Sequence, residues 1–331
     1  MRLGILGAGT VGSALLERLN DWPRLKVAGV LVRDLERSRP VEQALLSNDP
    51  GAVLEASDVI VELMGGTDQA GDLMLQALSE GKPVVTANKA VLAERWAEFL
   101  PFIRLGMVHF EASVMAGTPA VAALGTVLRA GAPLELHAIL NGTCSFMLTR
   151  LEQGEAFDTA LAEAQRLGYA EADPTLDIGG IDAAHKLAIL ARMAFDPELR
   201  WEDVLAGTQG ISHLTPAIVH EAMEDGGSVV LLGSITSGGG RWNAAVRPVY
   251  LPADHALRVI DGSRNGLLFR GRDSGEVMLL GPGAGGATTA SAVLADLLQL
   301  MAGRPGPAPL ERAAAIDPDY VPEELGELLR S

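Results

Sequence analysis

The stretch RLGILGAGTVG at residues 2–12 decides the fold of the first half of this chain. Residues 2–6 are a short apolar run that predicts a strand, and residues 13–19 are a helical run. The glycines lie between the two, so the pattern GxGxxG stands in the strand–turn–helix context that a dinucleotide-binding fold requires. The stretch therefore predicts the first strand and helix of a doubly wound α/β fold.

Each position of this loop has a predicted role. Gly7 permits a tight turn, Gly9 lets the backbone approach a pyrophosphate, and Gly12 allows the helix to pack closely on the strand. The N–H groups at the helix start, at Thr10 and Val11, face the anion. All five residues are candidate contacts to a dinucleotide cofactor.

Apolar runs and helical stretches alternate beyond the loop. Strands are predicted at residues 26–32, 59–64, 83–86 and 107–111, and helices at 71–80 and 90–100. This alternation is typical of a Rossmann-type parallel sheet, in which ligands bind at the carboxyl ends of the strands. Gly65 and Lys89 follow two of these strands, so both are candidate cofactor contacts. An ordinary structural role for Lys89 stays open.

The end of the second strand bears on the choice of cofactor. About 20 residues after the last glycine of the loop, an acidic side chain binds a ribose hydroxyl of NAD, whereas an arginine binds the 2′-phosphate of NADP. Here the chain has Arg33 beside Asp34, followed by Arg37 and Arg39. NADP is therefore favoured over NAD, with Asp34 as the feature that would serve NAD. The arginines could also belong to a solvated loop.

Composition excludes several classes of partner. The chain has 331 residues, enough for two domains, and 42 acidic against 26 basic residues give a formal charge of −16. That charge disfavours binding to nucleic acid or to an anionic membrane. No apolar run approaches the roughly 18 residues of a spanning helix, so a cytoplasmic protein is expected. The single cysteine, Cys144, excludes an intrachain disulfide.

The second half predicts a different, α+β domain. Strands are expected at residues 135–140, 228–236, 242–250 and 266–270, with longer helices among them. The predicted division is a dinucleotide-binding domain over 1–130, a substrate-binding and dimerisation domain over 131–280, and a segment over 281–331 that returns to the first domain. The glycine turn at 281–286 precedes an apolar helix, so Gly283 is a candidate cofactor contact, with a simple loop as the alternative.

A polar constellation, YAEADPTLDIGGIDAAHK, occupies residues 169–186. Asp182 and Lys186 lie four residues apart on one face of a mostly apolar helix, where a buried lysine could exchange protons. An exposed ion pair is the common alternative. Earlier, Asn141 to Thr143 end a strand and open a helix, where a carboxylate could bind or a plain N-cap could stand.

Six ordered motifs resemble those of homoserine dehydrogenase, over residues 7–301. They are GAGTVG at 7–12, KPVVTANKA at 82–90, EASVMAGTP at 111–119, NGTCSFML at 141–148, GYAEADPTLDIGGIDAAHK at 168–186 and GPGAGG at 281–286. Two positions depart from the usual pattern, since Ser145 stands where the family often has Asn and Thr288 where Pro is frequent.

The resemblance implies reversible hydride transfer between NAD(P)H and the aldehyde carbon of L-aspartate 4-semialdehyde, giving L-homoserine. It implies that Lys186 exchanges a proton with the reacting oxygen through water, that Lys89 assists at that oxygen, and that Asp182 orients the reacting group. The substrate-binding residues that it implies are Glu171, Asp177, Asp182, Gly142, Thr143 and Lys186. Carboxylates suit the ammonium of the amino acid, and a cation suits a developing alkoxide.

The resemblance also implies a monovalent cation, Na⁺ or K⁺. Its ligands would be the carboxylate of Glu111 and backbone oxygens of Val114, Ala116 and Thr118. Oxygen-only ligands suit a hard cation. The likeness also leads us to expect a homodimer through the second domain, a place in threonine and methionine biosynthesis, and weak or absent feedback inhibition by threonine.

Two other functions remain open at this point. One is a related NAD(P)-dependent dehydrogenase of another small amino acid, against which the spacing from Glu171 to Lys186 stands. The other is a non-catalytic dinucleotide sensor. A sensor needs no proton-transfer groups, so the presence of both Lys89 and Lys186 argues against it.

Overall fold

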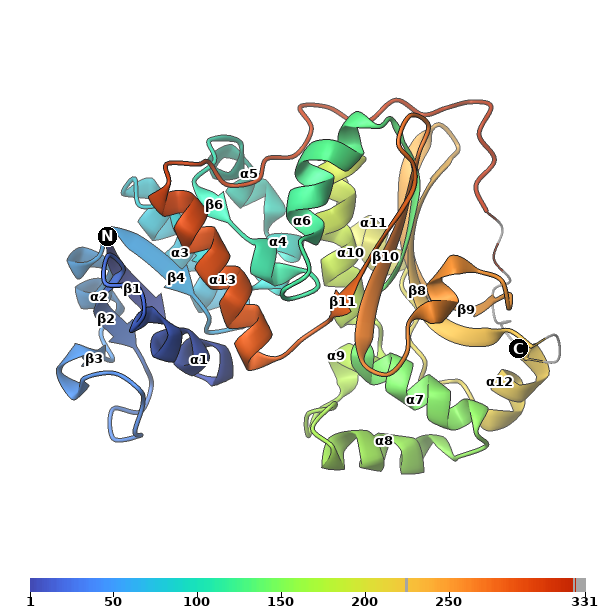
Figure 1. The fold of residues 1–331 in the computed structure, drawn as a ribbon, viewed down its shortest axis with the longest axis horizontal. Coiled ribbons are helices and arrows are strands. Elements are labelled where there is room, and N and C mark those ends of the chain that lie inside the picture. Colours follow the sequence, from blue (N-terminus) through green and yellow to red (C-terminus); the bar gives the residue numbers. More distant parts are fainter. Residues whose placement is uncertain (224–225, 324, 326–331) are drawn as a thin grey trace. The chain divides into compact units, whose positions relative to one another are not determined.

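The computed structural model describes residues 1–223, 226–323 and 325. Contacts between Cα atoms divide the chain into two compact units (Figure 1). The first unit contains residues 1–122 and 284–309, and the second contains residues 123–283 with the described residues from Leu310 onward. The sequence-based division placed the boundary at 130 and assigned the whole segment from 281 to the first domain, whereas the contacts place the chain from Leu310 in the second unit.

Within its described residues, the first unit contains a six-stranded parallel sheet in the order β3-β2-β1-β4-β5-β6. The strands are β1 (Arg2–Leu6), β2 (Lys26–Leu31), β3 (Leu46–Ser47), β4 (Val59–Glu62), β5 (Val84–Thr86) and β6 (Val108–His109). The helices are α1 (Thr10–Leu19), α2 (Pro50–Ala56), α3 (Asp68–Ser79), α4 (Lys89–Glu94), α5 (Trp96–Arg104) and α13 (Gly286–Met301), with short 3₁₀ turns η1 (Gln43–Leu45) and η2 (Glu111–Ser113). The predicted Rossmann-type sheet is confirmed.

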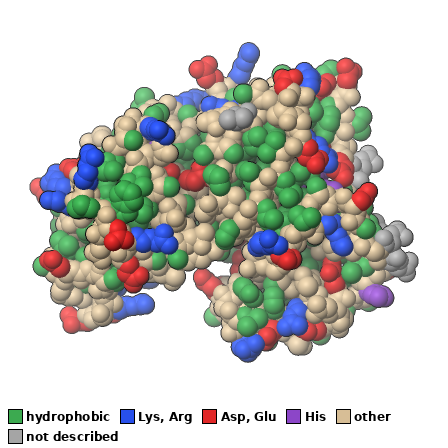
Figure 2. Space-filling view, in the orientation of Figure 1, with side chains coloured by type: hydrophobic (Ala, Val, Ile, Leu, Met, Phe, Trp, Pro, Cys, Tyr) green, Lys and Arg blue, Asp and Glu red, His purple; other side chains and the backbone are tan. Residues whose placement is uncertain are grey.

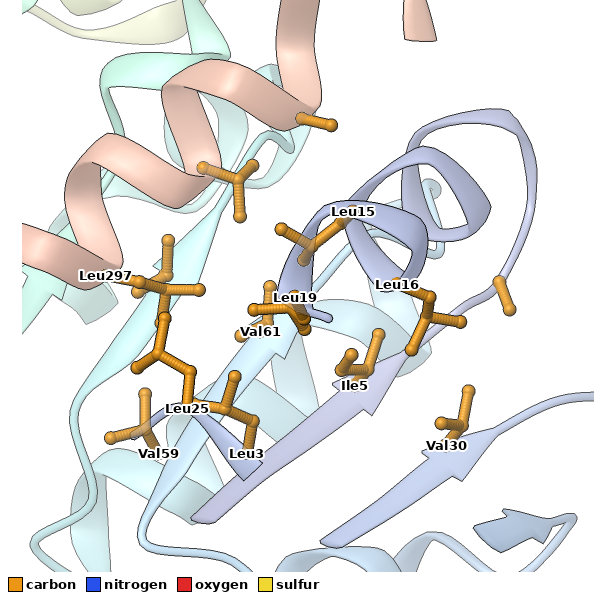
Figure 3. Close-up of a cluster of buried hydrophobic side chains, with 14 of the residues drawn as sticks. Leu3, Ile5, Leu15, Leu16, Leu19, Leu25, Val30, Val59, Val61 and Leu297 are labelled. Atoms are coloured by element: carbon orange, nitrogen blue, oxygen red, sulfur yellow. The ribbon is translucent and has the colours of Figure 1, made fainter. Parts of the chain in front are cut away.

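The core of this unit joins strands to two helices that are distant in sequence. Figure 3 shows Leu3 and Ile5 of β1 turned toward Leu15 and Leu19 of α1, with Leu297 of α13 beside them. These side chains are buried, and α1 packs against α13. The apolar side chains of β1 therefore hold in place the helix that begins at the glycine loop.

One predicted helix, over 90–100, is two helices in the structure. The break is at Arg95, whose backbone (φ −112°, ψ 22°) ends α4 and begins α5. Its guanidinium donates to the carbonyl oxygens of Thr67 and Asp68 and to the carboxylate of Glu98. The bonds to Thr67 and Asp68 tie Arg95 to a segment distant in sequence, and local periodicity gives no sign of them.

Among its described residues, the second unit contains a five-stranded antiparallel sheet in the order β11-β10-β7-β8-β9. The strands are β7 (Pro133–Ile139), β8 (Ser228–Gly238), β9 (Arg241–Leu251), β10 (Arg264–Gly271) and β11 (Gly275–Pro282). The helices are α6 (Ala120–Ala123), which begins in the first unit, α7 (Gly142–Glu152), α8 (Phe157–Arg166), α9 (Thr175–Ile178), α10 (Ile181–Ala194), α11 (Trp201–Ala206) and α12 (Pro216–Ala222), with a π-helical turn η3 (Leu124–Leu128) and a 3₁₀ turn η4 (Ala256–Val259). The predicted second α+β domain is confirmed.

Helix α10 is the element that positions the candidate chemistry. It packs against β7, β8 and β9, and its residues from Ala183 to Ala194 are all buried. Gly180 adopts a left-handed conformation (φ +80°) just before the helix, which a residue without a β-carbon adopts at little cost. Polar side chains on α10 are therefore held by a rigid, apolar support.

Among the described residues, no helix is both long and apolar enough to cross a membrane. On the face drawn in Figure 2, acidic and basic side chains are interspersed and form no large area of one sign.

Candidate active site

In the glycine loop, Gly9 has room for a side chain, whereas Gly7 and Gly12 do not. A β-carbon on Gly12 would lie 2.2 Å from the carbonyl oxygen of Gly7, and one on Gly7 would lie 2.7 Å from that of Leu63. A β-carbon on Gly9 would meet nothing within 4 Å. Packing therefore explains Gly7 and Gly12, whereas the open space at Gly9 is suited to a ligand that approaches the backbone.

A buried carboxylate organises the ends of β4 and β5. Glu62 accepts from the N–H of Met64 (2.7 Å) and from the hydroxyl of Thr86 (2.7 Å). Thr86 in turn accepts from the N–H of Asn88, and Asn88 donates to the carbonyl of Gly66 (2.8 Å). Burial raises the pKa of Glu62, and the hydrogen bonds that it accepts oppose the rise. This network holds the two strand-end loops to one another.

The other predicted cofactor residues occupy different settings. Arg33 is exposed just beyond β2, while Arg39 donates to the carbonyls of Asp34 and Arg37 and so shapes the loop itself. Lys89 is half-buried in the first turn of α4. Gly283 lies in the second unit, and a β-carbon there would be 2.1 Å from Oδ1 of Asn265.

The predicted cation ligands lie in a tight turn of the first unit. Met115 and Ala116 both have positive φ (55° and 46°), a conformation that is costly for residues with a β-carbon. Glu111 accepts from the N–H groups of Val121 (3.0 Å) and Ala122 (2.7 Å). Val114, Ala116 and Thr118 are buried around it.

Asp296 of α13 adds a second carboxylate to this turn by accepting from the N–H of Glu111 (3.0 Å). Burial raises the pKa of Glu111 to about 7, and burial with the charge of Glu111 raises the pKa of Asp296 to about 8. Two buried carboxyls that repel each other, beside backbone oxygens, fit an oxygen-ligated cation.

The second unit holds a network around Lys186. Its Nζ donates to Oδ2 of Asp182 (2.8 Å) and to the carbonyl oxygen of Leu140 (2.6 Å). Nδ2 of Asn141 bridges Oδ1 of Asp177 (2.7 Å) and Oδ2 of Asp182 (2.8 Å). Lys186 is 7% exposed, so this is a buried pair and not the exposed one of the alternative interpretation. The network places one ammonium and two carboxylates next to the start of α7.

The other predicted substrate residues are Gly142 and Thr143, at the start of α7, and Glu171, which lies outside that helix. Gly142 packs against Ser263, whose carbonyl oxygen would lie 2.7 Å from an added β-carbon. The hydroxyl of Thr143 donates to the carbonyl of Tyr169 (2.6 Å), which leaves the backbone of this helix start as the feature suited to a carboxylate. Glu171 is exposed on the loop before α9.

Cys144 lies beside the same network but is unsuited to chemistry. Its thiol contacts the carbonyl oxygen of Asp177 (3.2 Å). Burial, with the negative charges of Asp177 and Asp182, holds the pKa of the Cys144 thiol well above its ordinary value. A protonated, buried thiol is not a nucleophile.

One histidine pair in the second unit has the spacing of a metal site but not the chemistry. Ligand atoms of His137, His255 and Glu323 lie within 4.8 Å of one another. Nδ1 of His255 accepts the N–H of Leu257 (3.1 Å), so a neutral ring carries its proton on Nε2. That protonated nitrogen lies 3.8 Å from the Glu323 carboxylate, beyond hydrogen-bond distance, and Arg270 already binds this carboxylate.

Several residues of these networks were missed by sequence reasoning. The side chains of Asn141, Glu62, Asp296 and Asn265 had no predicted role, although the backbone around Asn141 did. Glu62 had a signal, because it is a charged residue in the apolar run VIVELM at 59–64. Asp296 and Asn265 had none, since their partners lie 185 and 125 residues away in the chain.

Comparison with known proteins identifies the family. A family model described as homoserine dehydrogenase matches residues 119–298, and one described as the NAD-binding domain of homoserine dehydrogenase matches residues 7–102. The chain belongs to the homoserine dehydrogenase family. A homoserine dehydrogenase of Bacillus subtilis is 35% identical over 317 residues, covering 91% of this chain and 73% of that protein. The chain is thus an NAD(P)-dependent oxidoreductase, and the resemblance drawn from the six motifs is confirmed.

Solved structures of the family have the same fold. A homoserine dehydrogenase from Thiobacillus denitrificans superposes with a TM-score of 0.83 at 38% identity, covering 91% of this chain and 73% of that one. A hyperthermophilic archaeal homoserine dehydrogenase, solved in complex with NADPH, has a TM-score of 0.77 at 27% identity and covers 92% and 99% of the two chains.

Proposed function

We propose that Lys186 is the proton-transfer group of this homoserine dehydrogenase. The observation that carries the proposal is the buried network of Lys186 with Asp182 and the carbonyl of Leu140. When L-homoserine is oxidised, its hydroxyl proton passes, through a water, to the neutral amine of Lys186; in reduction the ammonium returns it. A nicotinamide dinucleotide, when bound, would supply the hydride donor or acceptor of the reaction. Asp182 fixes the position of Nζ and compensates the charge that Lys186 gains.

The two ends of the amino acid fit different parts of the same unit. We assign the ammonium to the carboxylates of Asp177, Asp182 and Glu171, because an ammonium requires negative partners. Gly142 and Thr143 begin α7, and their N–H groups suit the substrate carboxylate. Asn141 donates a hydrogen bond to both Asp177 and Asp182 and so offsets the repulsion between the two carboxylates.

We assign the cofactor to the first unit and favour NADP. The open position at Gly9 and the helix start at Thr10 and Val11 suit the pyrophosphate, and the exposed Arg33 suits a 2′-phosphate. The archaeal relative binds NADPH, which supports the same choice here. Lys89 is proposed as a second cation that assists at the reacting oxygen.

We propose that the turn from Glu111 to Thr118 holds Na⁺ or K⁺. Glu111 supplies a carboxylate, Asp296 adds charge, and Val114, Ala116 and Thr118 supply carbonyl oxygens. Such an ion would relieve the repulsion between the two carboxyls and hold the strained turn. Its role is structural in this proposal.

The wider setting follows from the reaction. We propose that the enzyme acts as a cytoplasmic homodimer in the biosynthesis of threonine and methionine. Sedimentation of the purified protein would test the dimer, and a monomer at micromolar concentration would contradict it.

The central test is turnover of L-homoserine with NADP or NAD in potassium buffer, followed by absorbance of the reduced nicotinamide. The Lys186→Met variant should lose at least about 100-fold in kcat, since general acid–base groups contribute roughly 10²–10⁴-fold. Dinucleotide binding should stay unchanged. The matched control is Lys26→Met, an exposed lysine of β2, which should keep full activity. A Lys186→Met enzyme with normal kcat would remove Lys186 from the mechanism.

A further inference from the structure

Asn265 touches the same carbonyl group as Lys186. It is the second residue of β10, opposite Gly281 of β11, and it is fully buried. Its Nδ2 donates to the carbonyl oxygen of Leu140 at 2.9 Å. The same oxygen accepts from Nζ of Lys186 at 2.6 Å. A carbonyl oxygen has two lone pairs, so these two donors use its full capacity.

The amide of Asn265 is held in one orientation at a cost. Its Oδ1 is buried and receives no hydrogen bond from any described residue. Turning the amide over would place that oxygen against the carbonyl oxygen of Leu140, where two acceptors repel each other. Buried polar atoms are nearly always paired, so an unpaired oxygen indicates that the bond on the other side of the amide is the one that matters.

Gly283 closes the space around this amide. A β-carbon on Gly283 would lie 2.1 Å from Oδ1, 2.3 Å from Cγ and 2.6 Å from Nδ2 of Asn265. The glycine carries no unusual φ, so backbone conformation does not explain it. Its lack of a side chain is explained by the amide that lies against it.

We propose that Asn265 is a positioning residue that fixes the Leu140 carbonyl, and through it the ammonium of Lys186, and that Gly283 is a glycine in order to admit this amide. The inference rests on the proton-transfer role proposed for Lys186. With Asn265 in place, one lone pair of the Leu140 oxygen is occupied and the other sets the direction of Nζ. Without Asn265, both lone pairs of the Leu140 oxygen face Lys186, and the direction of Nζ is no longer fixed.

The first test is the pH dependence of kcat for L-homoserine oxidation by Asn265→Leu, a variant of similar size with no donor. Because Nζ of Lys186 is less well placed for proton transfer in this variant, kcat at pH 7.5 should fall about tenfold and the pH profile of kcat should shift. KM for L-homoserine and Kd for NADPH should change less than about twofold. The matched control is Asn243→Leu. It removes the hydrogen bond that the Asn243 side-chain amide donates to the carbonyl oxygen of Gly238 on the same sheet, and it should leave the pH profile unchanged.

The second variant is Gly283→Ala, whose added methyl group displaces the same amide without touching its chemistry. It should shift the pH profile in the same direction as Asn265→Leu and leave Kd for NADPH unchanged. A rise in Kd for NADPH with an unshifted profile would instead make Gly283 a cofactor contact and overturn its part of the proposal. If Lys186→Met abolishes turnover while Asn265→Leu keeps both kcat and profile, the positioning role fails alone. If Lys186→Met is active, the proposed function itself fails.

Discussion

The side chain of Asn141 has two structural roles. Its Oδ1 caps α7 by accepting the N–H of Cys144 (2.8 Å), while its Nδ2 bridges the carboxylates of Asp177 and Asp182. A cap alone contributes about 1 kcal/mol to stability, and a hydrogen bond to a charged group contributes about 1.5–3 kcal/mol. The residue therefore links the fold of the helix start to the charge balance of the site.

The Asn141→Ala variant removes the cap and the bridge together. We expect the free energy of unfolding to fall by about 2.5–4 kcal/mol and kcat/KM to fall at least about tenfold. Urea denaturation and the homoserine assay measure the two effects. The control is Thr215→Ala, which removes a cap on α12, and should lower stability with no loss of activity. If Asn141→Ala is as active as Thr215→Ala, the hydrogen bonds from Asn141 to Asp177 and Asp182 have no role in catalysis.

Glu62 should make a contribution to the free energy of unfolding that depends on pH. Its pKa is raised by burial above that of the unfolded chain, so the folded state binds the extra proton. The stability that Glu62 contributes is therefore present in full below about pH 4.3, the unfolded value, and is lost as the pH rises through the folded pKa.

The Glu62→Gln variant removes this titration and keeps most of the volume. We expect the difference in unfolding free energy between the variant and the wild type to shift in favour of the variant as the pH rises from 4 to 8. Denaturation at several pH values measures it. A difference that stays constant over that range would mean that Glu62 ionises normally.

At the scale of elements, the β1–α1 turn allows two similar substitutions with opposite expected effects. Gly12→Ala places a methyl group 2.2 Å from the backbone of Gly7 and should destabilise the first unit by about 1–3 kcal/mol. Gly9→Ala meets open space at an ordinary φ of −79°, so its melting temperature should match the wild type. Its affinity for NADPH should nevertheless fall, as measured by fluorescence titration. Normal NADPH binding by Gly9→Ala would contradict the assignment of this loop to the pyrophosphate.

The elements also show where sequence reasoning succeeds and where it ends. A mostly apolar helix carrying Asp182 and Lys186 was expected and is present as α10 (Ile181–Ala194), because its apolar spacing is local. Strand β11 (Gly275–Pro282) was not predicted: it alternates between exposed and half-buried residues and, among the described strands, pairs only with β10. Glu111 was expected at the end of a strand, but the strand β6 stops at His109 and Glu111 begins a 3₁₀ turn. The position of Glu111 depends on Asp296 of α13, a pairing that no local pattern encodes.

At the scale of the whole molecule, the segment from Leu310 is fastened to the second unit by two kinds of contact. Ala314 donates to the carbonyl of Phe195 (2.6 Å) and accepts from Nε1 of Trp242 (3.0 Å). Arg272 pairs with Asp317 at a more exposed place. Buried hydrogen bonds contribute about 1 kcal/mol each, whereas exposed ion pairs contribute about 0–1 kcal/mol.

This contrast predicts the order of two variants. Trp242→Phe, which loses its N–H donor, should lower the free energy of unfolding by about 1–2 kcal/mol. Arg272→Gln should lower it by less than about 0.5 kcal/mol, with a further reduction in high salt. Chemical denaturation ranks them, and a larger effect from Arg272→Gln would show that the ion pair holds the segment.

Helix α13 also has a consequence for synthesis on the ribosome. Ala290, Val293 and Leu297 of this helix complete the core that β1 and α1 begin. Residues 123–283, which belong to the other unit, are synthesised before them. At roughly 5–20 residues per second, Met301 is added about 10–40 s after Ala122. Throughout that interval the nascent sheet exposes the apolar face that α13 will cover. Chaperone binding to the growing chain should therefore peak before α13 is made and decline once it emerges.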